Sequence, residues 1–84
     1  MPQKTLPLNG VNRSYVLGHD NFNITYIGKS LEADLHCFID GNDLTLESSD
    51  SHMLHKAAEI MHIITQRAKN RKSHFRKEEL EKII

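Results

Sequence analysis

The sequence predicts an α+β fold, in which a three-stranded sheet carries helices packed on one of its faces. Two observations lead to this prediction. Two short segments of alternating polarity, residues 33–40 and 43–47, flank the turn sequence Gly41-Asn42 and indicate a β-hairpin. Apolar residues recur at helical spacing in two further stretches, residues 22–31 and 50–70. With a length of 84 residues, the chain forms one domain at most.

The N-terminal part contains one predicted strand and two predicted helices. Residues 4–8 alternate weakly, and Pro7 has no amide hydrogen to donate, so we place this strand at an edge of the sheet. Residues 11–17 suffice for one or two helical turns. After a polar turn, Asn21 is a favourable N-cap for an amphipathic helix over residues 22–31. The full order of elements is therefore β-α-α-β-β-α.

The hairpin is the clearest pattern in the chain. A two-residue loop at Gly41-Asn42 fixes which residues lie opposite one another. The expected pairs are Asp40 with Asp43, Ile39 with Leu44, and Cys37 with Leu46. The apolar residues of both strands then fall on the same face, so the turn and the polarity pattern agree. Cys37 lies on this inward face, where a thiol is usually inert packing.

A long helix is expected over residues 50–70, after a run of N-cap residues that ends at Ser51. Its predicted buried stripe consists of Leu54, Ala57, Met61, Ile64 and Ala68. His55, Glu59 and His62 share the opposite face. Such a stripe is usually a solvated helix face, and a metal site is the less favoured alternative.

The last residues form a further short helix that begins near Arg76, with Leu80, Ile83 and Ile84 on one face. An uncovered apolar stripe of this kind calls for a partner. We therefore expect residues 1–72 to form the domain, and residues 73–84 to lead into a downstream domain that these 84 residues do not include.

Composition and motifs exclude several classes of protein. The mean hydropathy of −0.52 and the lack of a long apolar run speak against a membrane span. The chain has no phosphate-gripping Walker motif, and no G-x-S-x-G, H-E-x-x-H or C-x-x-C motif. We therefore expect no enzymatic activity and no cofactor. The single cysteine cannot form an internal disulfide, which is typical of a reducing compartment such as the cytoplasm.

Charge is unevenly distributed although the net charge is zero. The first 48 residues carry three Lys or Arg and six acidic residues, whereas a basic cluster over residues 67–77 has no acidic residue. The cations of this cluster are Arg67, Lys69, Arg71, Lys72, Arg76 and Lys77. They form either a phosphate-binding patch or the solvated end of a helix.

A β-α-α-β-β-α order with a glycine-led turn between its first two helices resembles the type I KH domain, whose GXXG turn clamps a nucleic-acid backbone. The corresponding turn here is Gly18-His19-Asp20-Asn21. Asn21 replaces the second glycine, and Asp20 brings a negative charge to a turn that is usually basic. A plain N-capped helix start is the alternative interpretation.

The resemblance to KH domains implies a set of nucleic-acid-binding residues. They are Arg13, Gly18, His19, Asn21, Asn23 and Lys29. The turn would hold backbone phosphates, with Arg13 and Lys29 supplying charge nearby. Bases would lie in a groove between the second helix and the second strand.

Four segments also resemble the N-terminal domain of the PhoH family. Residues 16–24 are similar to its turn and helix start, and residues 30–35 to its helix end and second strand. Residues 41–46 resemble its hairpin, although Asp40 replaces the usual arginine. Residues 74–84 resemble the segment that leads into its ATPase domain, with Arg76-Lys77 in place of the frequent threonine cap and proline.

PhoH-like proteins are cytoplasmic P-loop ATPases linked to phosphate starvation and to RNA. The resemblance therefore implies an RNA-binding accessory domain that lies beside a downstream ATPase domain and has no ATP-binding residue of its own. The alternative is a degenerate KH fold that serves as a protein docking or homo-oligomerisation module through Leu80, Ile83 and Ile84. Asp20 and the acidic excess of residues 1–48 favour this alternative.

Overall fold

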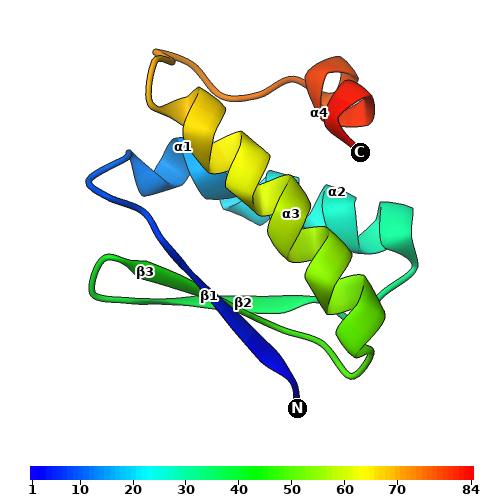
Figure 1. The fold of residues 1–84 in the computed structure, drawn as a ribbon. Coiled ribbons are helices and arrows are strands. Elements are labelled where there is room, and N and C mark those ends of the chain that lie inside the picture. Colours follow the sequence, from blue (N-terminus) through cyan, green and yellow to red (C-terminus); the bar gives the residue numbers. More distant parts are fainter.

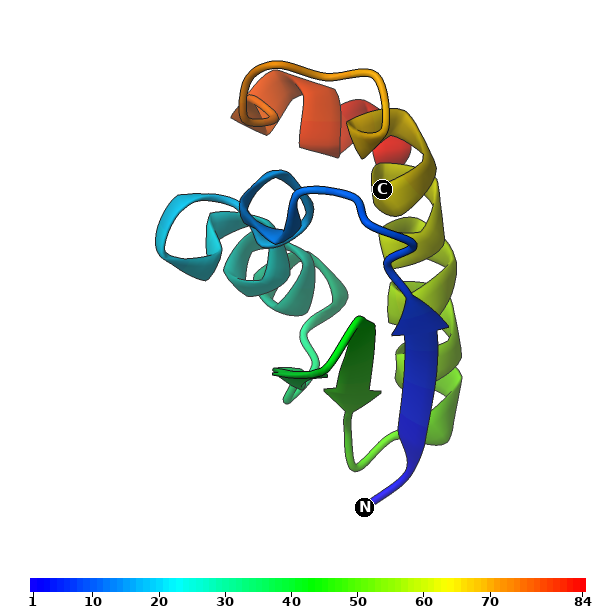
Figure 2. The same ribbon diagram turned by 90° about the vertical axis from the view of Figure 1, so that its left-hand side faces the viewer.

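The computed structural model describes residues 1–84 and shows the predicted α+β fold, with a three-stranded antiparallel sheet and helices on one of its faces (Figures 1 and 2). The elements are β1 (Gln3–Pro7), α1 (Arg13–Leu17), the single 3-10 turn η1 (His19–Asn21), α2 (Phe22–Leu31), β2 (His36–Asp40), β3 (Asp43–Glu47), α3 (Ser51–Ala68) and α4 (Lys77–Ile83).

The sheet has the order β1-β3-β2, and both pairs of strands are antiparallel. β1 lies at an edge, as Pro7 predicts. The register of the hairpin is also confirmed, because Ile39 lies opposite Leu44 and Cys37 lies opposite Leu46. The alternation thus places the apolar side chains of both hairpin strands on the face that the helices cover.

The strand predicted over residues 33–40 begins only at His36. Glu32 adopts a left-handed conformation and ends α2, with its N–H bonded to the carbonyls of Gly28 and Lys29. Asp34 then accepts hydrogen bonds from the hydroxyl groups of Ser48 and Ser49, each at 2.9 Å, and from the Ser49 amide. Residues 32–35 therefore form a turn that is tied to the β3–α3 connection instead of pairing with β3.

The helix α3 buries the stripe that its periodicity predicts and forms the centre of the core. Leu54, Ala57, Met61, Ile64 and Ala68 are all buried. The carboxylate of Asp50 accepts hydrogen bonds from the amides of His52 and Met53, which fixes the start of the helix at Ser51. On the sheet, Leu44 and Leu46 are fully buried beneath the helical layer.

The C-terminal segment packs as part of the same domain. Phe75 and Leu80 are buried in the core that residues 1–72 form, and the Tyr26 hydroxyl of α2 lies 3.2 Å from the Glu81 carboxylate of α4. The expected protein-contact stripe therefore needs a correction: Leu80 is fully buried and unavailable to a partner, Ile83 is half-buried, and Ile84 is 41 % exposed. None of the helices combines the length and the hydropathy that a membrane span requires.

The two neighbours Ile63 and Ile64 provide a test of this packing. Ile64 is fully buried, whereas Ile63 is 38 % exposed on the outer side of α3. We predict that Ile64→Ala lowers the free energy of unfolding by about 3 kcal/mol, since it leaves a cavity in a thin core. The matched variant Ile63→Ala should cost less than about 1 kcal/mol. Urea denaturation measures both, and equal losses would contradict the packing described here.

Candidate nucleic-acid interface

The turn between α1 and α2 has a backbone that depends on glycine and asparagine. Gly18 has φ +84° and ψ 167°, a conformation that is essentially restricted to glycine. Asp20 and Asn21 both lie in the left-handed region, with φ of 52° and 61°. Asparagine tolerates this region better than most residues, so Asn21 can replace the second glycine of the KH turn. Asn21 occupies the N-cap position of α2, as predicted, but its side chain makes no capping hydrogen bond.

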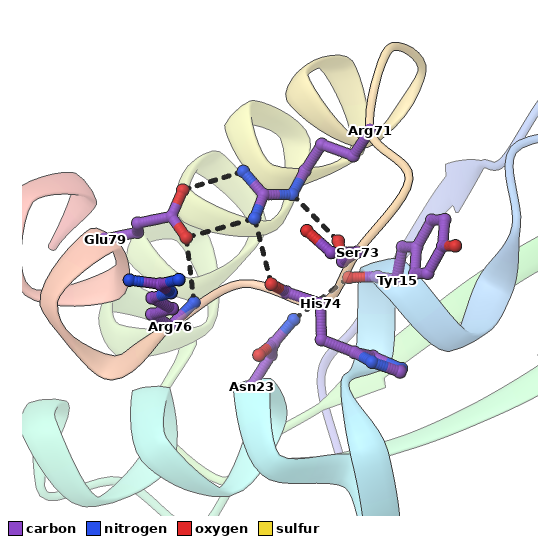
Figure 3. Close-up of polar contacts among 7 residues, drawn as sticks. All are labelled: Tyr15, Asn23, Arg71, Ser73, His74, Arg76 and Glu79. Carbon is purple, nitrogen blue, oxygen red and sulfur yellow. Dashed lines mark hydrogen bonds and ion pairs between the residues drawn. The ribbon is translucent and has the colours of Figure 1, made fainter.

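Asn23 holds the turn in place through side-chain hydrogen bonds to α1. It is fully buried, and its Nδ2 donates to the carbonyls of Tyr15 at 3.1 Å and Val16 at 2.9 Å, in the last turn of α1 (Figure 3). A Cβ at Gly18 would lie 2.8 Å from Asn23 Oδ1, so glycine is needed for this close approach. Gly18 and Asn23 therefore shape the turn, and the expectation that Asn23 contacts nucleic acid is wrong because its side chain is inaccessible.

The other predicted binding residues lie at the surface. Arg13, His19, Asn21 and Lys29 are all exposed. His19 lies beside Asp20, with 3.3 Å between its Nε2 and the Asp20 carboxylate, and both side chains project into solvent. The turn thus presents an imidazole and a carboxylate together at the surface.

A groove of about 390 Å³ runs along α2 beside the segment that leads into β2. Its walls comprise Ile24, Thr25, Gly28, Lys29, Glu32, Ala33 and Leu35. This is the place that the KH resemblance predicts for bases. The half-buried side chains of Ala33 and Leu35 provide apolar surface against which a base can pack, and Lys29 supplies a cation, whereas Ile24 is buried in the core beneath them. Glu32 adds a negative charge to the same groove.

Residues 69–76, here called the C-terminal strap, connect α3 to α4 and are organised by Arg71 (Figure 3). The Arg71 guanidinium binds both carboxylate oxygens of Glu79, at 2.7 and 3.0 Å, and donates to the carbonyls of Ser73 and His74. It also lies 4.0 Å from the centre of the Phe75 ring. Arg71 therefore holds the strap in place and is not free to bind phosphate.

The strap lies next to the Gly18 turn. The His74 ring packs edge-on against Tyr15, with 5.3 Å between the ring centres (Figure 3). It also lies 6.3 Å from the ring of His19. The remaining cations of the basic cluster are all exposed: Arg67, Lys69, Lys72, Arg76 and Lys77. Sequence reasoning missed Tyr15 and His74, because neither belongs to a motif and only the folded chain brings them together.

The other chemically reactive side chains do not form a catalytic or metal-binding cluster. Cys37 is half-buried, and burial raises the pKa of its thiol, which disfavours the nucleophilic thiolate. His55 contacts Glu59 at 2.7 Å on the solvent side of α3, but no group of three or more His, Cys, Asp or Glu is placed to hold a metal ion.

Comparisons of the chain with models of known families, with curated proteins and with solved structures found no match. The site is therefore interpreted from its own geometry.

The close approach of Gly18 to Asn23 gives a prediction for stability. Gly18→Ala should lower the free energy of unfolding by about 2–4 kcal/mol, because it adds backbone strain and a clash with the buried amide. Gly10 has a similar φ of +78°, but nothing lies within 4 Å of its Cβ position, so Gly10→Ala should cost only about 1 kcal/mol. Thermal and urea unfolding of the two variants measure the difference, and equal costs would show that the clash is relieved.

The Arg71–Glu79 contact gives a prediction for pH dependence. Hydrogen bonds from the Arg71 side chain and then from the Arg76 amide lower the pKa of Glu79. A carboxyl whose pKa is lower in the folded state contributes stability that is complete above its ordinary pKa and is lost as pH falls below it. Glu79→Gln should therefore destabilise the chain at pH 7 and flatten the loss of stability between about pH 5 and pH 3.

Glu78→Gln is the matched control, since Glu78 is the adjacent residue of α4 and makes no hydrogen bond to Arg71. Urea denaturation at several pH values compares the two variants. The same slope for Glu79→Gln and the unmodified chain would mean that the contact with Arg71 does not contribute to stability in solution.

Proposed function

We propose that this chain binds single-stranded nucleic acid, RNA in particular, as a KH-like accessory domain without catalytic activity. The observation that carries the proposal is the position of the strap. The His74 contacts with Tyr15 and His19 bring the basic segment beside the Gly18 turn. A turn that can hold phosphate, with exposed cations in the segment beside it, is what a backbone-tracking site requires.

In this proposal the phosphates follow the turn and the strap, and the bases enter the groove along α2. Exposed cations such as Lys72 and Arg76 neutralise phosphate, while the half-buried apolar walls at Ala33 and Leu35 accept base faces. The negative charges of Asp20 and Glu32 oppose binding, so we expect modest affinity and a strong dependence on salt.

The wider assignment follows from the sequence resemblance. We place the chain in the cytoplasm, as the N-terminal domain of a PhoH-like P-loop ATPase that would contact the ATPase domain following it. The half-buried, unpaired Cys37 agrees with a reducing compartment. A degenerate KH fold that docks protein is the second candidate, favoured by the exposed Asp20 and by the apolar side chains of Ile63 and Ile84 at the surface.

An NMR titration of the labelled 84-residue chain with mixed-sequence single-stranded RNA tests the proposal. We expect shifts in the turn, in the groove residues and in the strap that weaken as salt rises. Lys29→Glu should weaken binding by about three- to tenfold, and Asp20→Asn should strengthen it. Lys82→Glu is the control, because it makes the same charge change at an exposed residue near the C-terminal end of α4, outside the turn, the groove and the strap.

The outcomes separate a specific groove from a nonspecific basic segment. Shifts confined to the strap, or equal weakening by Lys29→Glu and Lys82→Glu, would show that only general electrostatic attraction is at work. An absence of shifts at low salt would rule out nucleic-acid binding by this chain and leave protein docking as the better account.

A further inference from the structure

The outer side of α3 presents one large apolar residue in the middle of a charged face. Ile63 is 38 % exposed, although Ile64 next to it is fully buried. Helical spacing places Lys56, Glu59 and Arg67 on the same side as Ile63. An exposed isoleucine at the centre of such a face has no role in the core of this chain.

Two hollows flank Ile63, and both include Ile63 and Glu59 in their walls. One hollow, of about 290 Å³, lies between α3 and the ends of α2 and α4, and its other walls are Leu31, Lys56, Ile60, Ile83 and Ile84. The other, of about 380 Å³, lies between α3 and β1, and its other walls are Lys4, Leu6, His55, Ala58 and His62. Apolar side chains thus lie beside Ile63 on both of its sides, so a second copy that covers Ile63 would also cover part of this apolar surface.

In one orientation, the charges on this face of one copy are complementary to those on the same face of a second copy. Glu59 lies four residues before Ile63, and Arg67 lies four residues after it. When two α3 helices cross antiparallel at Ile63, Glu59 of each copy faces Arg67 of the other, whereas a parallel contact places like charges together. Arg67 has no ion pair within the chain. Glu59 contacts His55 at 2.7 Å, but its side chain is 66 % exposed and can also accept a contact from Arg67 of a second copy.

We infer that the outer face of α3 binds a second copy of this chain, in an antiparallel, twofold-symmetric contact centred on Ile63. The 18 residues of α3 extend over about 27 Å, which makes a small interface. Association is accordingly weak and concentration-dependent. The contact uses Arg67 of the basic cluster but not the Gly18 turn or the α2 groove, so the groove of each copy stays open in the dimer.

Sedimentation of the 84-residue chain, from about 10 µM to about 1 mM, tests the inference. The unmodified chain should form dimers reversibly within this range, and Ile63→Glu should weaken the dimer at least tenfold. Phe38→Glu is the control, because Phe38 is a similarly exposed apolar residue, at 46 %, on the strand β2. It should leave the dimer unchanged, and circular dichroism verifies that each variant is folded.

Charge reversal tests the orientation. Glu59→Arg or Arg67→Glu alone places like charges together at both symmetric contacts and should weaken the dimer about tenfold. The double variant, Glu59→Arg with Arg67→Glu, restores opposite charges and should return the dissociation constant to within about threefold of the original. A monomer at all concentrations, a dimer unaffected by Ile63→Glu, or a double variant without recovery would each overturn the inference.

Discussion

The contact between the Asn23 amide and the last carbonyls of α1 is the constraint on which the binding surface depends. It joins two helices whose axes are separated by only a short turn, and it satisfies carbonyls that would otherwise lack a partner at the end of α1. It is possible only because Gly18 carries no side chain, since a Cβ there would collide with Asn23. The left-handed residues Asp20 and Asn21 complete the turn before α2 begins at Phe22. The close approach of Gly18 and Asn23 thus fixes where α2, one wall of the groove, begins relative to α1.

A second constraint, at Arg71, decides where the basic segment lies. Of the six cations in residues 67–77, Arg71 alone is withdrawn from solvent into contacts with Glu79 and Phe75. Its two bonds to strap carbonyls fold the segment back over the helices, and His74 then meets Tyr15. Arg71, which the sequence shows as one of six cations in a cluster, thus positions the segment that carries the others. Its guanidinium is occupied by contacts within the chain and is not available to a phosphate.

The sequence was sufficient for the features that two independent signals specify. The hairpin register was predictable because the loop length and the alternation around Gly41-Asn42 require the same pairing. The α3 stripe was predictable because 18 residues repeat one period. The structural role of Asn23 was not predictable, because the local sequence pattern does not distinguish a buried side-chain amide from an exposed one. Leu80 was misplaced for a related reason: an apolar face predicts burial, but not whether this chain or a partner provides the cover.

The two proposed surfaces reinforce each other physically. A single groove with Asp20 and Glu32 at its edges and no net charge on the chain is a weak site for a polyanion. Two copies joined through α3 as proposed would hold two such grooves at a fixed separation, so a strand bound in one groove would be present at high effective concentration for the other. Avidity would then grow without any change in the contacts of either site. The same coupling would make the proposed RNA affinity depend on protein concentration, and Ile63, outside the turn and the groove, would control binding to long strands but not to short ones.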